Sequence, residues 1–120
     1  MYEEPLLDFQ AIEKLQIVTA KRGPDFWISL IENFLTHTAT LIDELKQFHK
    51  QGNQEQVNKI AHKLKGTVAS FGALALAQVC KEIENHKQDK TKIDILIKQL
   101  DECYLNTQIQ LLNLTKNTEK

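Results

Sequence analysis

The chain has 120 residues, of which 42% are hydrophobic and 26% are charged, and its formal net charge is −1. These values are typical of one globular domain with its own core, and they argue against a disordered or fibrous protein and against nucleic acid as the partner. Charged or amide residues interrupt each apolar run before the ~20 residues that a membrane span requires. We therefore expect a single domain over residues 1-120 that does not insert directly into a membrane.

The N-terminus lacks the basic flank and the apolar stretch of a secretion signal. Cys80 and Cys103 lack the spacing of a metal site, and in a chain without a secretion signal two cysteines are more commonly thiols than a disulfide. We therefore expect two buried thiols and a cytoplasmic protein.

Five successive segments carry apolar residues at helical spacing, and no segment alternates as a half-buried strand would. Residues that often begin or end helices separate these segments: Asp8 is a candidate N-cap, Gly23 and Pro24 divide the first two segments, and Gly52 and Gly72 stand at later breaks. The sequence predicts helices over about residues 8-21, 24-51, 54-71, 73-87 and 92-114.

The apolar positions of each segment lie on one face. They are Ile12, Leu15 and Val18 in the first; Trp27, Leu30, Ile31, Phe34, Leu35, Leu41, Ile42, Leu45 and Phe48 in the second; Val57, Ile60, Ala61, Leu64, Val68 and Phe71 in the third; Leu76, Ala77, Val79, Cys80 and Ile83 in the fourth; and Ile93, Leu96, Ile97, Leu100, Cys103, Tyr104, Leu111 and Leu114 in the fifth. Residues 36–40 include β-branched residues with weaker helix propensity, but we expect one continuous helix there. Because each face can be buried only against the others, the sequence predicts an all-α fold, an antiparallel four-helix bundle with a short additional N-terminal helix.

The third segment carries His62 about 120–140° from the middle of its apolar face, so we expect the imidazole to face solvent. Gly66 lies one turn further on, where a side chain would normally lean back over the ring. Glycine inside a helix costs about 1 kcal/mol relative to alanine, so its presence needs a reason, and space for a reacting group is one. Close packing of two helices is the alternative explanation.

Lys65, three residues after His62, brings a cation within reach of any group bonded to the ring. A carrier of phosphoryl groups needs an accessible nucleophile, nearby positive charge and space. His62, Lys65 and Gly66 meet these three needs, and an ordinary surface histidine beside an ordinary surface lysine is the alternative interpretation.

The segment resembles the histidine-containing phosphotransfer domain of multistep two-component relays, whose pattern Ala-His-x-Leu-Lys-Gly-Ser-Ser-x-x-x-Gly precedes a helix with a central cysteine. The matching positions are Ala61, His62, Leu64, Lys65, Gly66, Gly72 and Cys80, with Thr67 and Val68 in place of the two small residues. By this resemblance, His62 would accept a phosphoryl group from an aspartyl phosphate on a receiver domain and pass it to the aspartate of another receiver. Lys65 would neutralise the phosphoryl oxygens, and Gly66 would leave space for them.

The resemblance also implies a phosphocarrier that is not an enzyme, without its own kinase or nucleotide-binding site. It implies no cofactor, because the partner receiver domain would bring the Mg²⁺. The expected partners are response-regulator receiver domains and a hybrid sensor histidine kinase, and we expect a monomer. Exposed residues near the histidine that could contact a partner are Asn58, Lys59, Lys63 and Ala69.

Members of this family often carry a glutamine on the fourth helix that faces the histidine, and an ungapped comparison places Glu84 there. A carboxylate at that place would repel a phosphoryl group unless it turned away or met Lys65 or Lys81. We therefore do not count Glu84 among the expected site residues.

Two other functions remain open. The chain could be a helical interaction module that binds a receiver or a kinase without being phosphorylated. It could also be the phosphorylated domain of a larger hybrid or chemotaxis-type histidine kinase, and Ser70-Phe71-Gly72 has some likeness to the chemotaxis type.

His37, His49 and His86 have no neighbours like those of His62, so we expect ordinary surface or boundary residues. Glu82 and His86 could share a metal at a spacing of four, but a second such pair is missing.

Overall fold

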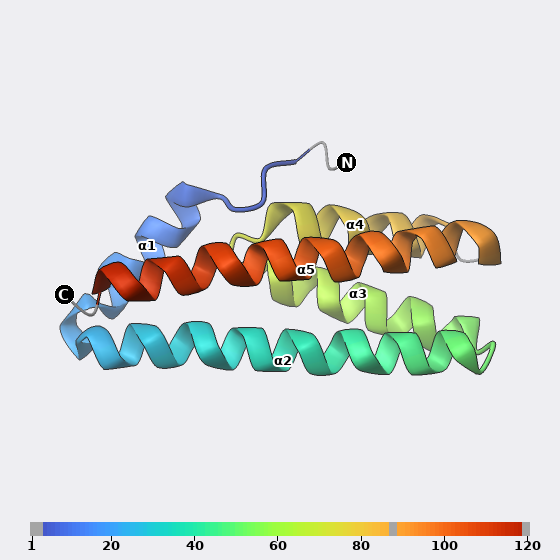
Figure 1. Cartoon of the computed structure of the whole chain (residues 1–120), viewed down its shortest axis with the longest axis horizontal. Helices are drawn as coiled ribbons and strands as arrows, with labels where there is room; N and C mark the ends of the chain where they lie inside the picture. The colour runs from blue at the N-terminus through green and yellow to red at the C-terminus, as the bar shows by residue number, and fades with distance from the viewer. Residues whose placement is uncertain (1–3, 87–88, 119–120) are drawn as a thin grey trace.

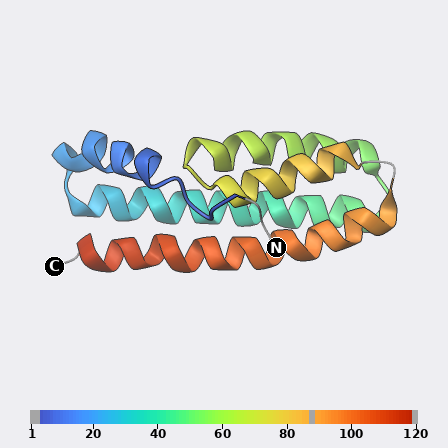
Figure 2. The same cartoon turned by 90° about the horizontal axis from the view of Figure 1, so that it is seen from above.

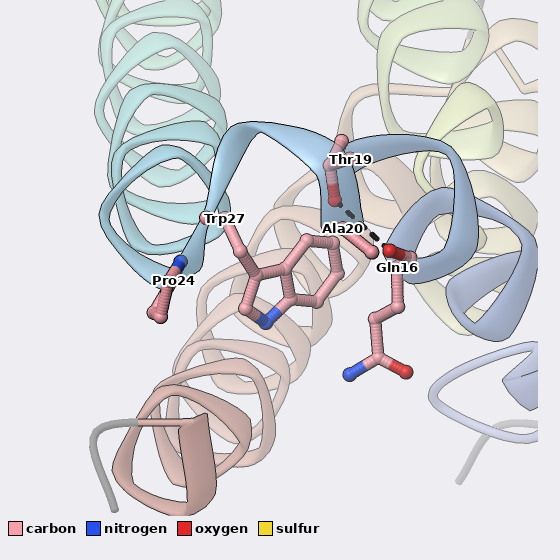
Figure 3. A pocket seen from close by; sticks show the side chains of 6 residues that line it. Gln16, Thr19, Ala20, Pro24 and Trp27 are labelled. Carbon is pink, nitrogen blue, oxygen red and sulfur yellow. Dashed lines mark hydrogen bonds between the residues drawn. The ribbon is translucent and has the colours of Figure 1, made fainter.

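The computed structural model describes residues 4–86 and 89–118. In chain order these residues form α1 (Phe9–Thr19), the 3-10 turn η1 (Ala20–Arg22), α2 (Pro24–Lys50), α3 (Gln54–Ser70), α4 (Leu74–Asn85) and α5 (Lys90–Thr118). Helices α2 to α5 form the bundle, and α1 lies at the end of the bundle where α2 begins (Figures 1 and 2). The predicted four-helix bundle with a short N-terminal helix is therefore confirmed within the described residues.

Successive helices of the bundle run in opposite directions (Figure 1). Helix α3 packs against α2 and α4, and α5 packs against the same two helices. Helices α3 and α5 therefore occupy opposite corners, and the outer face of α3 is turned away from α5. The molecule is elongated, with extents of 47 × 25 × 19 Å.

The helix boundaries differ from the expected ones by two residues or more at three ends. The first helix changes to a 3-10 turn at Ala20 instead of continuing to residue 21 as an α-helix. The fifth helix, expected over 92-114, begins earlier and ends later, and the Asp89 side chain accepts a hydrogen bond from the backbone nitrogen of Lys92 at 3.1 Å in its first turn. The fourth helix ends at Asn85, and its expected end at residue 87 lies outside the described residues. Helix α2 is continuous through residues 36–40, as predicted.

Both ends of α3 are held in place. At its start, the side chain of Asn53 accepts a hydrogen bond from the backbone nitrogen of Gln56 at 3.2 Å, which caps the helix. At its end, Gly72 has φ +77, a conformation that favours glycine. The backbone nitrogen of Asp8 donates to the Gly72 carbonyl at 2.7 Å. The segment before α1 is thus fastened to the turn between α3 and α4.

The core contains apolar side chains from each of the described α-helices. Helix α3 contributes Val57, Ala61, Leu64 and Val68, and α4 contributes Ala75, Leu76, Val79, Cys80 and Ile83. Phe71, next to the turn, stacks on Phe34 of α2 with 4.4 Å between ring centroids. Because burial fixes the inner face of α3, the opposite face of the helix is held toward solvent.

Two expectations about single residues are wrong. Val18 is 75% exposed, because the short helix α1 packs lightly on α2 and buries Ile12 instead. His49 was expected at the surface or boundary, but it is buried, and its Nε2 contacts Asp94 Oδ1 on α5. This contact ties the end of α2 to the beginning of α5.

Cys80 and Cys103 are buried thiols, as expected. Burial is the main cause that raises the pKa of Cys80 to about 12. Among the described helices, none combines the length and the apolar character that crossing a membrane would require.

Candidate functional site

His62 lies on the outer face of α3, and its side chain is 72% exposed. Its neighbours on the inner face, Ala61 and Leu64, are completely buried. The core therefore holds the helix while the imidazole ring reaches solvent, which is the orientation that the sequence pattern predicted.

Glu84 on α4 bridges His62 and Lys65. One carboxylate oxygen, Oε2, lies 2.9 Å from Nδ1 of His62, and the other, Oε1, lies 2.8 Å from Nζ of Lys65. The Glu84 side chain is only 18% exposed. The carboxylate therefore lies between α3 and α4, on the inner side of the exposed ring, and holds the ring by the nitrogen that faces α4.

The charge state of Glu84 decides which nitrogen of His62 carries a proton. Burial favours the neutral form of Glu84, but the contacts with Lys65 and His62 outweigh burial and lower the pKa of the carboxyl group. Glu84 is therefore ionised at neutral pH and can only accept hydrogen bonds. Nδ1 of His62 must then donate to Glu84, which in the neutral ring leaves the electron pair on Nε2.

Open space surrounds Gly66. A Cβ atom added at this glycine would have no heavy atom within 4 Å beyond its own helix backbone and chain neighbours. Close packing against another helix therefore does not explain the glycine, and its φ is not in the left-handed region. The remaining explanation is the unobstructed surface one turn above His62.

Glu84 is the contact residue that the sequence reasoning left out. The ungapped comparison placed it opposite His62, and a contact with Lys65 or Lys81 was one of the two ways in which a carboxylate could be accommodated there. Sequence alone does not show whether a side chain turns toward its neighbour helix or away. The observed geometry selects the contact, with Lys65 and with His62 together.

Of the other histidines considered, His37 is exposed, as expected, and His86 caps the end of α4. Its Nδ1 donates to the backbone carbonyl of Glu82 at 2.9 Å, and the carboxylate of Glu82 lies 3.7 Å away. Within residues 4–86 and 89–118, no group of three or more His, Cys, Asp or Glu side chains is placed to hold a metal ion.

A family profile described as the Hpt domain matches residues 29–113, which include all of α3 and α4 and most of α2 and α5. The chain belongs to the Hpt domain family. Its His62, Lys65 and Gly66 all lie in the matched region.

This Hpt domain is also similar to individual proteins. It is 29% identical over 72 residues to the phosphorelay intermediate protein YPD1 of Candida albicans, a match that covers 59% of this chain and 39% of that protein. The chain thus spans well under half the length of that relative.

Two solved structures share the fold. The crystal structure of histidine-containing phosphotransfer protein B from Pseudomonas aeruginosa has a TM-score of 0.83 at 23% identity, with 96% of this chain and 98% of that chain covered. The X-ray structure of a putative histidine-containing phosphotransfer protein from rice has a TM-score of 0.80 at 20% identity, with 96% and 85% covered. The bundle and its additional helix are therefore shared by Hpt proteins.

Proposed function

We propose that this Hpt domain is a phosphorelay intermediate, which accepts a phosphoryl group on Nε2 of His62 and passes it to the aspartate of a receiver domain. The hydrogen bond between Nδ1 and Glu84 carries this proposal. It holds the exposed ring in one orientation and leaves the free electron pair on the nitrogen that is available to a partner.

The transfer itself needs no proton movement at His62. Nε2 attacks the phosphorus of an aspartyl phosphate in line with the leaving oxygen, the N–P bond forms, and the P–O bond breaks with its electron pair leaving on the aspartate carboxylate. The Nδ1 proton stays in its hydrogen bond to Glu84, which faces the positive charge that develops on the ring. In the onward step a carboxylate oxygen of the acceptor aspartate attacks the phosphorus, the new O–P bond forms, and the N–P bond breaks with its electron pair returning to Nε2 of a neutral imidazole.

Lys65 supplies the cation for the phosphoryl oxygens. Its side chain is 35% exposed and pairs with Glu84 in the resting state, and its flexible stem allows the ammonium group to turn toward a phosphoryl group on His62. Two unit charges ~4 Å apart attract by about 1 kcal/mol in water and ~4 at a partly screened surface. Lys65 therefore stabilises the phosphoryl group without trapping it, and the open surface at Gly66 gives that group room.

We further propose that the domain has no cofactor and no kinase activity of its own. The carboxylate nearest to the ring, Glu84, is already held by two partners, so the Mg²⁺ that phosphoryl transfer uses would enter with the receiver. The partners are receiver domains, including the receiver of a hybrid sensor kinase, and the carrier acts as a monomer. The buried thiols Cys80 and Cys103 support a reducing compartment, the cytoplasm.

The test is incubation of the chain with phosphorylated receiver domains from its source organism. The expected result is acid-labile, base-stable phosphate on the chain, which His62→Gln removes. His37→Gln, which changes another exposed histidine on α2, is the matched control and should leave the label intact. Label that persists in His62→Gln would end the proposal.

A receiver or kinase that binds the chain equally well with and without His62, and leaves no label, would support the interaction module instead. Phosphorylation of His62 by a kinase domain with ATP, but by no receiver, would support the hypothesis that the chain is the phosphorylated domain of a chemotaxis-type histidine kinase.

A further inference from the structure

The surface around His62 is rich in lysine although the chain as a whole has a net charge of −1. Lys59, Lys63 and Lys65 lie near His62 on α3, and Lys81 lies on α4. Lys81 and Lys65 line the same groove, which has a volume of about 530 Å³. We call Lys59, Lys63, Lys65 and Lys81 the cationic face.

Three carboxylates near the cationic face, those of Glu55, Glu82 and Glu84, already have a lysine or histidine partner. Glu84 is mostly buried and holds Lys65, and Glu55 pairs with Lys59 at 3.3 Å. Glu82 and Glu4 also line the groove, and the carboxylate of Glu82 is turned toward His86.

The positive charges of Lys63 and Lys81 are available to a partner. Both side chains are exposed, and neither forms an ion pair within the part of the chain that the structure describes. Lys63 follows His62 by about 100° around the helix, on the side turned away from Lys65. Lys81 lies on the next helix, across the groove from Lys65. Unpaired cations thus lie on both sides of the exposed ring.

We propose that the cationic face docks an acidic surface of the receiver domain, and that Lys63 and Lys81 steer the receiver to His62 by charge. This inference rests on the proposed function and names the surface chemistry of its partner. A partner that carries an aspartyl phosphate and holds its own Mg²⁺ with carboxylates is negatively charged around the reacting group. Charges of opposite sign on the two surfaces favour encounter in the productive orientation.

Steering by exposed charges acts on association and not on the chemical step. Lys63 and Lys81 touch neither His62 nor Glu84 in any described contact, so their loss should leave transfer within the complex unchanged. Their effect should also weaken with salt, because the screening length falls from about 10 Å at 0.1 M to about 3 Å at 1 M ionic strength. These two properties distinguish steering from a role in catalysis or folding.

The experiment compares a double variant, Lys63→Gln with Lys81→Gln, with a control of equal charge, Lys92→Gln with Lys98→Gln. The control lysines are exposed on α5, at the corner of the bundle opposite α3. The donor is the phosphorylated receiver that labels His62 fastest, and transfer is followed in rapid-quench experiments at low and at high salt. Binding of the same receiver without phosphate is measured in parallel by calorimetry.

At low salt the double variant should lose about tenfold in the second-order rate constant for transfer, the scale of change expected when local charge complementarity is removed. The loss should shrink toward zero at high salt, the rate at saturating receiver should change by less than about twofold, and the control should match the wild type. An unchanged salt dependence in the double variant, or an equal loss in the control, would overturn the inference.

Failure of the proposed function has a different signature, since no receiver would then label His62. In that case the calorimetric titration uses the receiver that binds the wild-type chain most tightly, and it still tests the cationic face. Weaker, salt-dependent binding in the double variant supports the cationic face, and equal binding by both variants contradicts it.

Discussion

Replacing Gly66 with larger residues should make the protein more stable and less active. Gly66 is in the interior of α3, has a helical backbone, and would accept a Cβ atom without meeting any neighbour within 4 Å. Gly66→Ala should therefore recover the helix propensity that glycine forgoes, about 1 kcal/mol. Gly66→Gln should gain about 0.5 kcal/mol, because glutamine is a somewhat weaker helix former than alanine.

The activity should change in the opposite direction. A side chain at position 66 leans back toward the N-terminus of α3 and covers the ring of His62. The methyl group of Gly66→Ala covers little of the ring, so this variant should transfer phosphate at a rate close to that of the wild type. The longer amide of Gly66→Gln should slow transfer from the receiver by about tenfold or more, which corresponds to a barrier raised by about 1.4 kcal/mol.

Thermal unfolding and transfer kinetics, measured on the same samples of Gly66→Ala and Gly66→Gln, test the two expected changes in stability and activity. A gain of 1 kcal/mol corresponds to a rise of about 4 °C in Tm for a domain of this size. A Gly66→Gln protein that is more stable and slower cannot owe its slow transfer to unfolding. A variant that is less stable than the wild type would show that Gly66 has a structural role, and an unchanged transfer rate would show that access to His62 does not depend on it.

Three further substitutions test the site and its support. The pKa of Glu84 is lower in the folded state than the unfolded value of 4.5, so the ionised carboxylate stabilises the fold above pH 4.5, and this stabilisation is lost as pH falls through the folded pKa. Glu84→Gln should therefore lower the free energy of unfolding in urea by about 1–2 kcal/mol at pH 7 and by less at pH 3. An equal loss at the two pH values would contradict the ion pair. Lys65→Met should keep the fold and slow transfer by about tenfold, so a rate equal to that of the wild type would remove Lys65 from the site. Gly72→Ala should lower the free energy of unfolding by about 2 kcal/mol, because φ is +77 and the new Cβ would lie 3.1 Å from that of Ala11; an unchanged urea midpoint would show that the turn adjusts.

The sequence predicted the fold and the exposed histidine because both follow from periodicity. Apolar spacing identifies the buried side of each helix, so the position of His62 opposite that side was available without coordinates. The same spacing was wrong for Val18. A pattern shows which face is apolar, but not whether a neighbour is present to cover it, and α1 is too short and too lightly packed to bury that residue.

The ionic contacts of His49 and Glu84 could not be predicted in the same way, because they join residues on different helices. The pairing of His49 with Asp94 depends on how the end of α2 meets the beginning of α5, and the bridge at Glu84 depends on the spacing and rotation of α3 relative to α4. The sequence offered one hint, an acidic residue where related proteins often have an amide. A carboxylate there would be expected to repel a phosphoryl group on His62, but the sequence contained no information on the direction in which the Glu84 side chain points.

The pairing of Glu84 explains how a carboxylate can lie beside a phosphorylated histidine, and it requires Lys65 to change its partner. The carboxylate is paired on both oxygens, with the Nδ1 proton on one side and the ammonium group on the other, so its charge is largely compensated before a phosphoryl group arrives. In the proposed transfer, a phosphoryl group on Nε2 would make the ring positive beside Glu84, and the ring would then replace part of the charge that Lys65 provided. The Lys65 ammonium group could then turn outward to the phosphoryl oxygens while Glu84 stays paired with the positive ring. Glu84 would thus be paired with a cation in both states, with Lys65 before phosphorylation and with the ring after it.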